Sequence, residues 1–267
     1  MSKVSRKLSI LLLVVSLLFA GAVGTLAAEQ VLKIGATPVP HAEILEFIKP
    51  LLAARGIKLE IIEFTDYVTP NLALADGSID LNFFQHTPYL NQFKADHNLE
   101  LVSVLKVHVE PFGLYSTKIN SLEQLAEGAT IALPNDPSNE GRALLLLANH
   151  GLIELTAEDE LKATPLDITK NPKKLRFKEL EAAQLPRVLP DVSAAFINTN
   201  YALEAGLNPL ADALIIEGNE SPYANILVVR AEDQERPVLQ ELITVITGDN
   251  VRQFILDKYQ GAVVPVF

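Results

Sequence analysis

Short apolar runs alternate with amphipathic helical patterns along most of the sequence, and this alternation limits the possible folds more than any other feature. A strand-like run followed by a segment of helical periodicity and another strand-like run predicts a βαβ succession. Parallel strands joined in this way form a sheet with helices on both faces. We therefore predict an α/β fold. The expected strands are 31–36, 59–64, 79–83, 101–107, 129–133, 175–180, 193–197, 213–216 and 224–229. The expected helices are 41–55, 138–150 and 182–189, a helical pair over 238–259, and two more helices beginning at Thr69-Pro70 and Thr87-Pro88.

The βα succession occurs twice, which predicts two lobes. We expect the second lobe to be inserted into the first. Residues 29–110 and 223–267 would form the first lobe, and residues 111–222 the second. Each lobe would be built on a mostly parallel sheet flanked by helices. A cleft between two α/β lobes is a common place for a small-molecule site.

Residues 1–28 have the pattern of a secretory signal peptide. Three basic residues within the first seven precede the apolar run 8–20, and small residues offer a cleavage site after Ala28. The alternative is an uncleaved anchor, because the stretch 8–28 is long enough to span a bilayer. Both alternatives predict an exported chain in the periplasm or at the cell surface.

The composition excludes several functions. Cleavage after Ala28 would remove three basic residues and change the formal net charge from −11 to −14. Such an acidic surface opposes binding to nucleic acid or to anionic membranes. The chain has no cysteine, so disulfides, thiol chemistry and thiolate metal sites are excluded.

Aromatic residues gather where two of the expected strands end. Tyr67 lies in TDYVTPN, and Phe84, His86 and Tyr89 lie in NFFQHTPYL. Ligands of open α/β sheets bind at strand ends, and aromatic rings can hold an aliphatic chain or a thioether. The alternative is that these rings belong to the core.

The segment LPNDPSNEGRALLLL, residues 133–147, places Arg142 in the first turn of an expected helix. Amide groups at a helix N-terminus attract anions, and a guanidinium can bind a carboxylate through two hydrogen bonds. Arg142 is therefore a candidate carboxylate-binding residue. The alternative is a surface arginine paired with a neighbouring glutamate.

Two further segments carry asparagines beside expected strands. FINTNYA contains Asn198 and Asn200, and ESPYANILV contains Asn225. An asparagine amide offers both a donor and an acceptor, which suits the two charged groups of an amino acid. Asparagine also forms turns and helix caps, so a structural role is the alternative.

The sequence contains little that indicates an enzyme. Its five histidines lack the spacing of known metal motifs, and neither a GxSxG elbow nor a Walker loop is present. We expect no catalytic residues, no metal and no cofactor. The alternatives are a zinc site assembled from three distant histidines, and an enzyme or sensor lobe on the same fold.

Six motifs in order resemble the methionine-binding subunits of bacterial ABC importers, the NlpA-type lipoprotein family. The motifs are DYVTPN, FFQHTPYL, LPNDPSNEGRALLLL, ELEAAQLPR, INTNYA and ESPYAN. The resemblance implies a two-lobed, periplasmic-binding-protein-like fold of type II. It also implies that the protein captures methionine, in the L- and also the D-form, and delivers it to a permease and its ATPase. Another small amino acid or a methionine-containing dipeptide is the alternative ligand, and we expect a monomer.

The resemblance also implies roles for individual residues. Four residues match the aromatic pocket around the ligand side chain, namely Tyr67, Phe84, His86 and Tyr89. Arg142 matches the residue that binds the ligand carboxylate, with Asn139 nearby. Asn198 and Asn225 match polar residues that hold the amino-acid backbone, and Asn200 and Tyr223 are further candidates.

The chain departs from the family at one point. Family members are usually lipoproteins with an N-terminal cysteine, but Gly21 and Ala22 occupy the region where that cysteine would lie. We therefore expect an exported protein without a lipid anchor, or one that is tethered by its uncleaved signal.

Overall fold

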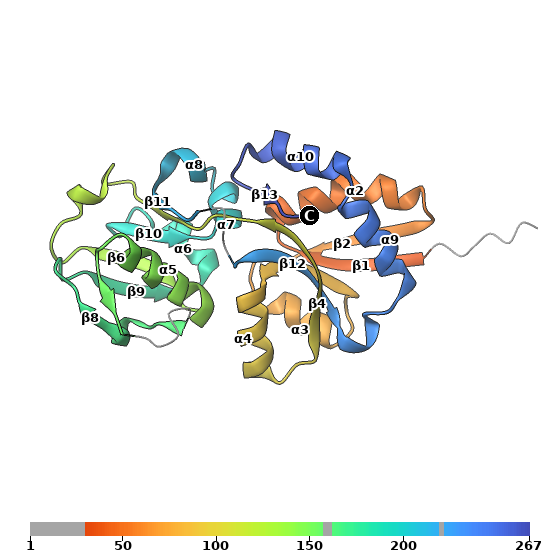
Figure 1. The fold of residues 1–267 in the computed structure, drawn as a ribbon, viewed down its shortest axis with the longest axis horizontal. Helices are drawn as coiled ribbons and strands as arrows, with labels where there is room; N and C mark the ends of the chain where they lie inside the picture. Colours follow the sequence, from red (N-terminus) through yellow and green to blue (C-terminus); the bar gives the residue numbers. More distant parts are fainter. Residues whose placement is uncertain (1–29, 157–161, 219–221) are drawn as a thin grey trace, which may run out of the picture.

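A computed structural model describes residues 30–156, 162–218 and 222–267 of the chain. The predicted signal, residues 1–28, lies outside the described residues. Two β-sheets lie side by side, each with helices on its faces, which confirms the predicted α/β class (Figure 1). Within the described part of the chain, no helix has both the length and the apolar character needed to cross a membrane.

The first sheet has six strands in the order β13-β4-β12-β3-β1-β2. Its strands are β1 (Gln30–Ala36), β2 (Ile57–Glu63), β3 (Leu81–His86), β4 (Leu101–Val109), β12 (Ala224–Arg230) and β13 (Val264–Pro265). β1 runs parallel to β2 and β3, whereas β12 runs antiparallel to β3 and β4. The short helical turn η1 (Pro38–Ala42) follows β1.

Helices cover both faces of the first sheet (Figure 1). They are α2 (Glu43–Ala53), α9 (Pro237–Ile246) and α10 (Asp249–Tyr259) on one face, and α3 (Thr69–Ala75) and α4 (Thr87–His97) on the other. Successive residues of a strand point to opposite faces, so β12 supplies both cores. Leu227 packs in the core under α2 and α9, and Ile226 packs in the core under α3 and α4. Burial on both faces explains why the stretch 226–229 of β12 is apolar throughout.

The second sheet has five strands in the order β11-β5-β10-β6-β9. Its strands are β5 (Gly113–Tyr115), β6 (Thr130–Pro134), β9 (Arg176–Leu180), β10 (Ala194–Ile197) and β11 (Ala213–Ile216). The core on one face includes α5 (Pro137–Asn149), and the core on the other includes α6 (Leu185–Val188) and α7 (Thr199–Glu204). The remaining elements are β7 (Glu154–Leu155), β8 (Ile168–Lys170), α8 (Pro209–Asp212), η2 (Leu122–Gln124), η4 (Pro165–Asp167), η5 (Ala182–Gln184) and η6 (Ala231–Asp233).

Both sheets are mixed, so the prediction of mostly parallel sheets was wrong in this detail. β6 runs parallel to β9 and β10, but β5 runs antiparallel to β10 and β11. A crossover helix brings the chain back to start a parallel neighbour, and this is how β1, β2 and β3 are connected. β5 and β12 instead begin where the chain passes from one sheet to the other. The sequence alternation carries no information about the direction of such strands.

The chain changes sheet twice in the described residues, between Val109 and Gly113 and between Ile216 and Ala224. Near the first change, the hydroxyl of Thr199 at the start of α7 donates a hydrogen bond to the Pro111 carbonyl. The strand ends that surround these changes carry the polar residues described next.

Candidate functional site

A partly open cavity of about 20 Å³ lies between the two sheets. Its first-sheet wall consists of Tyr67, Phe84, Gln85, His86, Tyr89, Glu110 and Asn225, and its second-sheet wall consists of Asn139, Arg142, Asn198, Thr199 and Asn200. Nine of the ten residues predicted from the sequence therefore line one cavity. The tenth, Tyr223, does not line it but lies against Arg142, with the guanidinium carbon 4.0 Å from the ring centroid.

His86 connects the end of β3 to the start of α4. His86 is the cap residue of α4, which begins at Thr87 as expected, and its Nδ1 accepts the backbone N–H of Tyr89 at 3.1 Å. The ring proton therefore lies on Nε2, which donates to Asn139 Oδ1 at 3.1 Å. Burial, with the positive charge of Arg142, lowers the pKa of His86 to about 3, so the imidazole is neutral.

Three aromatic rings form the apolar part of the first-sheet wall. The Tyr67 ring centroid lies 5.8 Å from that of Phe84 and 5.7 Å from that of Tyr89. The hydroxyl of Tyr89 donates to the Tyr67 carbonyl at 2.9 Å, and that of Tyr67 donates across the cavity to Asn200 Oδ1 at 2.6 Å. The rings thus form a wall for an apolar group, and their polar ends are already hydrogen-bonded.

The start of α5 fixes the direction of the hydrogen bonds on the second-sheet wall. Asp136 caps this helix, and its Oδ1 accepts both the backbone N–H and the side-chain Nδ2 of Asn139, each at 3.0 Å. A carboxylate cannot donate, so Asn139 must direct its Oδ1 away from Asp136, toward His86 and Asn198. Asn198 Nδ2 donates to Asn139 Oδ1 at 3.1 Å, which leaves Asn198 Oδ1 as an acceptor.

Two polar atoms of the second-sheet wall are buried without a hydrogen-bond partner in the described part of the chain. They are the acceptor Asn198 Oδ1 and the donor Asn200 Nδ2. An unsatisfied buried polar group costs about 1–3 kcal/mol. A molecule that supplies a donor to the first and an acceptor to the second would recover this free energy.

Arg142 is buried, with 3% of its surface exposed, in the first turns of α5. Its Nε donates to Glu217 Oε1 at 3.0 Å, and its Nη2 binds Glu217 Oε2 and donates to the Glu110 carbonyl at 3.0 Å. The alternative interpretation was a surface arginine paired with a glutamate. Arg142 is indeed paired with a glutamate, but it is buried and does not lie at the surface. Among the described residues, no hydrogen bond takes Nη1.

Glu110 was missed by the sequence analysis, which treated residues 109–113 only as a crossing between lobes. It directly follows β4, is 7% exposed and lines the cavity. Burial raises the pKa of Glu110, while His41, Arg142 and the backbone N–H of Asn200 oppose that rise. Glu110 could have been identified from its position, because it is an acidic residue at the end of an expected strand and beside an expected crossing between the lobes. Gln85 and Thr199 were also missed, although they lie in the quoted motifs FFQHTPYL and INTNYA.

Two of the five histidines meet at Glu110. His41, His108 and Glu110 place their potential metal-ligand atoms within 4.8 Å of one another. The distance from His108 Nε2 to Glu110 Oε1 is 2.7 Å, that of a hydrogen bond. Two ligands of a tetrahedral zinc ion would lie about 3.3 Å apart, given zinc–ligand bonds of about 2.0–2.1 Å. The geometry is therefore that of a hydrogen-bonded cluster.

The two sheets and the polar cavity between them define a two-lobed periplasmic-binding-protein-like fold of type II. The chain belongs to the NlpA lipoprotein family, whose model matches residues 32–267. This family consists of substrate-binding proteins of ABC importers and not of enzymes.

Relatives with known names cover most of the chain. The probable D-methionine-binding lipoprotein MetQ of Vibrio cholerae is 42% identical over 250 residues, which are 93% of this chain and 93% of that protein. A nutrient-binding protein from Burkholderia cenocepacia, solved bound to methionine, has a TM-score of 0.86 at 45% identity and matches 88% of this chain and 100% of that one. A periplasmic substrate-binding protein of an ABC transporter from Coxiella burnetii has a TM-score of 0.84 at 47% identity, with coverages of 88% and 100%.

Proposed function

We propose that this protein is an extracytoplasmic substrate-binding protein that captures methionine and delivers it to an ABC permease and its ATPase. The observation that carries the proposal is the arrangement of the cavity. Donors and acceptors without partners lie beside an apolar aromatic wall, and a free amino acid has charged groups and a side chain that complement both.

The carboxylate of the ligand would bind at Arg142. The Nη1 group of this guanidinium remains for a ligand, and Asn200 Nδ2 is a second donor on the same wall. A hydrogen bond to a charged group contributes about 1.5–3 kcal/mol. Glu217, which binds the other edge of the guanidinium, would orient it.

The ammonium group would bind at Glu110 and Asn198. Asn198 Oδ1 is an acceptor without a partner, and the Glu110 carboxylate supplies the opposite charge. Asn225 lines the cavity beside Glu110, so its amide would contact the same end of the ligand. These positions agree with the roles that the family resemblance implies for Asn198 and Asn225.

The thioether side chain would lie against Tyr67, Phe84 and Tyr89. Burial of a methionine side chain contributes about 1.5–3 kcal/mol, and sulfur–aromatic contacts add about 0.3–1.5 kcal/mol. Methionine in particular is supported by the Burkholderia cenocepacia protein, which was solved with this ligand, and by the MetQ relative. The proposal covers both enantiomers of methionine, because the MetQ relative is named for D-methionine.

Binding would require the walls to separate. A cavity of about 20 Å³ has room for about one water molecule. We propose that the two lobes open for ligand entry and then close again. The first lobe consists of residues 29–110 and 223–267, and the second consists of residues 111–222. The bond from Tyr67 to Asn200 and the bond from His86 to Asn139 join the two walls and would form on closure.

We further propose that the chain is exported by residues 1–28 and acts as a monomer without a lipid anchor. The absence of a cysteine supports the missing lipid anchor. Mass spectrometry of the exported protein would show either cleavage after Ala28 or a retained signal. A lipid-modified N-terminus would contradict the proposal.

Isothermal titration of unfolded, ligand-stripped and refolded protein tests the assignment. We expect heat of binding with L-methionine or D-methionine and weaker binding of methionine-containing dipeptides. If neither enantiomer bound, the methionine assignment would be wrong. Binding of another small amino acid alone would support the alternative ligand, and turnover of an amide or ester would support an enzyme.

A further inference from the structure

We propose that His41 and His108 are positioning residues that hold Glu110 in the orientation in which it binds the ammonium group of the ligand. The inference rests on the proposed function, since it concerns the same cavity. Neither histidine lines the cavity, but His108 is hydrogen-bonded to Glu110, which does, and His41 Nε2 lies 3.2 Å from the same carboxylate oxygen.

Two neighbouring elements bring these side chains together. His41 lies in η1, His108 in β4, and Glu110 directly follows β4. His41 and His108 are 1% and 0% exposed. Both imidazoles also pack against Phe83, at centroid distances of 4.6 and 5.3 Å, so neither ring can turn freely.

The hydrogen-bond partners of His41 place its proton on Nε2. This atom lies 3.2 Å from Glu110 Oε1 and 3.1 Å from Asn225 Oδ1, which are both acceptors. The opposite atom, Nδ1, lies 2.7 Å from the Thr37 hydroxyl, which can donate to it. The acceptors at Nε2 thus set the tautomer in which His41 donates toward the cavity, and the buried Thr37 hydroxyl supplies the matching donor to Nδ1.

His108 donates from Nε2 to the same carboxylate oxygen at 2.7 Å. Its Nδ1 is buried and has no hydrogen-bond partner within residues 30–156, 162–218 and 222–267. A buried nitrogen atom without a hydrogen-bond partner costs free energy. The role of the His108 imidazole therefore lies in its hydrogen bond to Glu110.

The two imidazoles together leave part of the carboxylate free. His108 donates to Oε1, His41 Nε2 lies 3.2 Å from the same oxygen, and the backbone N–H of Asn200 also acts on the carboxylate. A carboxylate can accept about four hydrogen bonds, so at least one position remains for a cationic group in the cavity. Neutral donors stabilise the charged carboxylate in a buried site without adding a positive charge that would repel an ammonium.

The test compares two ligands that differ only in the ammonium group, L-methionine and 4-(methylthio)butanoate. His108→Phe keeps a ring of similar size but removes the donor. We expect it to weaken binding of L-methionine at least tenfold and to change binding of 4-(methylthio)butanoate by less than about twofold. His108→Gln, which retains an N–H donor, should recover most of the loss.

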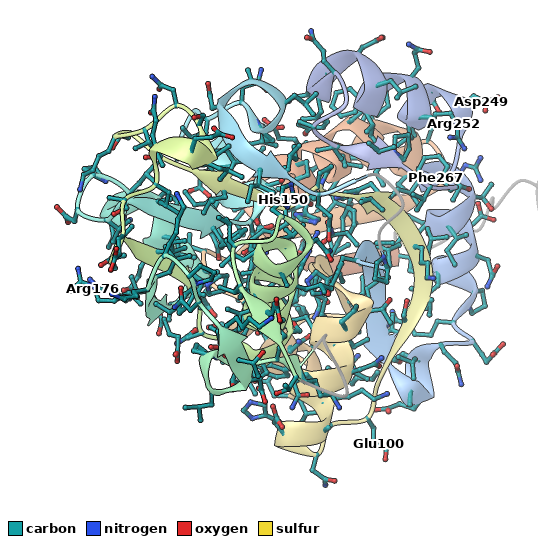
Figure 2. The ribbon with its side chains drawn as sticks, turned by 60° about the vertical axis from the view of Figure 1, so that its left-hand side comes forward. Glu100, His150, Arg176, Asp249, Arg252 and Phe267 are labelled. Atoms are coloured by element: carbon teal, nitrogen blue, oxygen red, sulfur yellow. The ribbon has the colours of Figure 1, made fainter. Side chains whose placement is uncertain are left out.

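The controls separate positioning from folding. His150 is exposed at the end of α5 and labelled in Figure 2, so His150→Gln should bind both ligands like the wild type. If His108→Phe fails to fold, Thr37→Val tests the same idea, because it removes only the hydroxyl at His41 Nδ1. We expect Thr37→Val to weaken L-methionine binding about threefold and to spare the analogue.

Several results would overturn the proposal. If His108→Phe weakened the binding of L-methionine and of 4-(methylthio)butanoate equally, the histidines would have a purely structural role. If it changed neither affinity, they would not position Glu110 at all. A further loss from His108→Phe in a Glu110→Gln background would also contradict action through Glu110. Zinc that competes with L-methionine in metal-free protein would make the cluster a metal site. If wild-type protein binds no methionine, the proposed function fails instead.

Discussion

The two walls of the cavity differ in how far their polar groups are satisfied before any ligand is present. On the first-sheet wall, His86 Nδ1 accepts the backbone N–H of Tyr89, and Gln85 is hydrogen-bonded to Asn71 and Asn82 through both ends of its amide. On the second-sheet wall, Asn198 and Asn200 each keep a buried atom without a partner in the described structure.

This difference separates stability from recognition. Polar groups that are fully hydrogen-bonded fix the shape of a wall, whereas an unsatisfied buried group gains most when a ligand arrives. We infer that the part of the first-sheet wall around Gln85 is built in advance and that the second-sheet wall, together with Glu110, supplies most of the binding free energy for the charged groups of the ligand. Substitutions on the two walls should therefore act on different measurements.

The largest effect is expected for Arg142→Ala, on the second-sheet wall. Loss of one or two charge-assisted hydrogen bonds of about 1.5–3 kcal/mol each should weaken methionine binding about 100-fold or more, without unfolding the protein. Titration calorimetry measures the affinity, and circular dichroism checks the fold. Arg176 is exposed on β9 and labelled in Figure 2, so Arg176→Ala is the matched control. Wild-type affinity of Arg142→Ala would remove the carboxylate site from the proposal.

Gln85→Ala, on the first-sheet wall, should mainly lower stability, whereas Arg142→Ala should mainly lower affinity. Gln85 accepts from Asn71 at 2.9 Å and donates to Asn71 at 2.6 Å and to Asn82 at 2.9 Å. Asn71 and Asn82 are both 0% exposed, so the substitution leaves buried amides unsatisfied and should lower the free energy of unfolding by about 2–3 kcal/mol. Chemical denaturation of ligand-free protein measures this change. Unchanged stability with much weaker binding would reverse the assignment of the two walls.

Asn198→Ala removes a buried orphan acceptor. It should weaken methionine binding about tenfold, because one hydrogen bond to the ammonium is lost. The unfolding free energy of the ligand-free protein should change by less than about 1 kcal/mol, since Asn139 Oδ1 still accepts from His86. A loss of stability that matches the loss of affinity would show that Asn198 belongs to the prebuilt part of the cavity.

Acidification should weaken binding through Glu110. The groups that face this carboxyl are His41, His108, Arg142 and the backbone N–H of Asn200, and burial outweighs them, so its pKa lies above the ordinary value of 4.5. A proton on Glu110 removes the negative charge that binds the ammonium, so affinity should fall as pH decreases through this raised pKa. Calorimetry over a pH series measures the profile. The fall should be absent in Glu110→Gln, and its persistence there would assign it to another group.

The sequence predicted the alternation of elements well, because burial on both faces makes strand stretches such as 226–229 of β12 apolar throughout. It also predicted the residues that meet at the cavity, since their motifs lie at strand ends and helix starts. It could not predict that Arg142 pairs with Glu217, because the two residues are 75 positions apart and only the fold joins them. The role of Glu110 depends likewise on His41, which comes from another element.

Glu217→Gln is expected to have the smallest effect, and it tests how Arg142 is used. Glu217 binds the Nε and Nη2 edge of the guanidinium, so the ligand would use Nη1. If Glu217 only orients the guanidinium, the isosteric glutamine keeps an acceptor there, and methionine binding should weaken less than about fivefold. Titration calorimetry with Glu217→Gln and Glu217→Ala measures the effect, and the alanine variant should lose more. A gain in affinity of tenfold or more would instead show that Glu217 competes with the ligand carboxylate for Arg142, because removal of a competing anion frees the whole guanidinium.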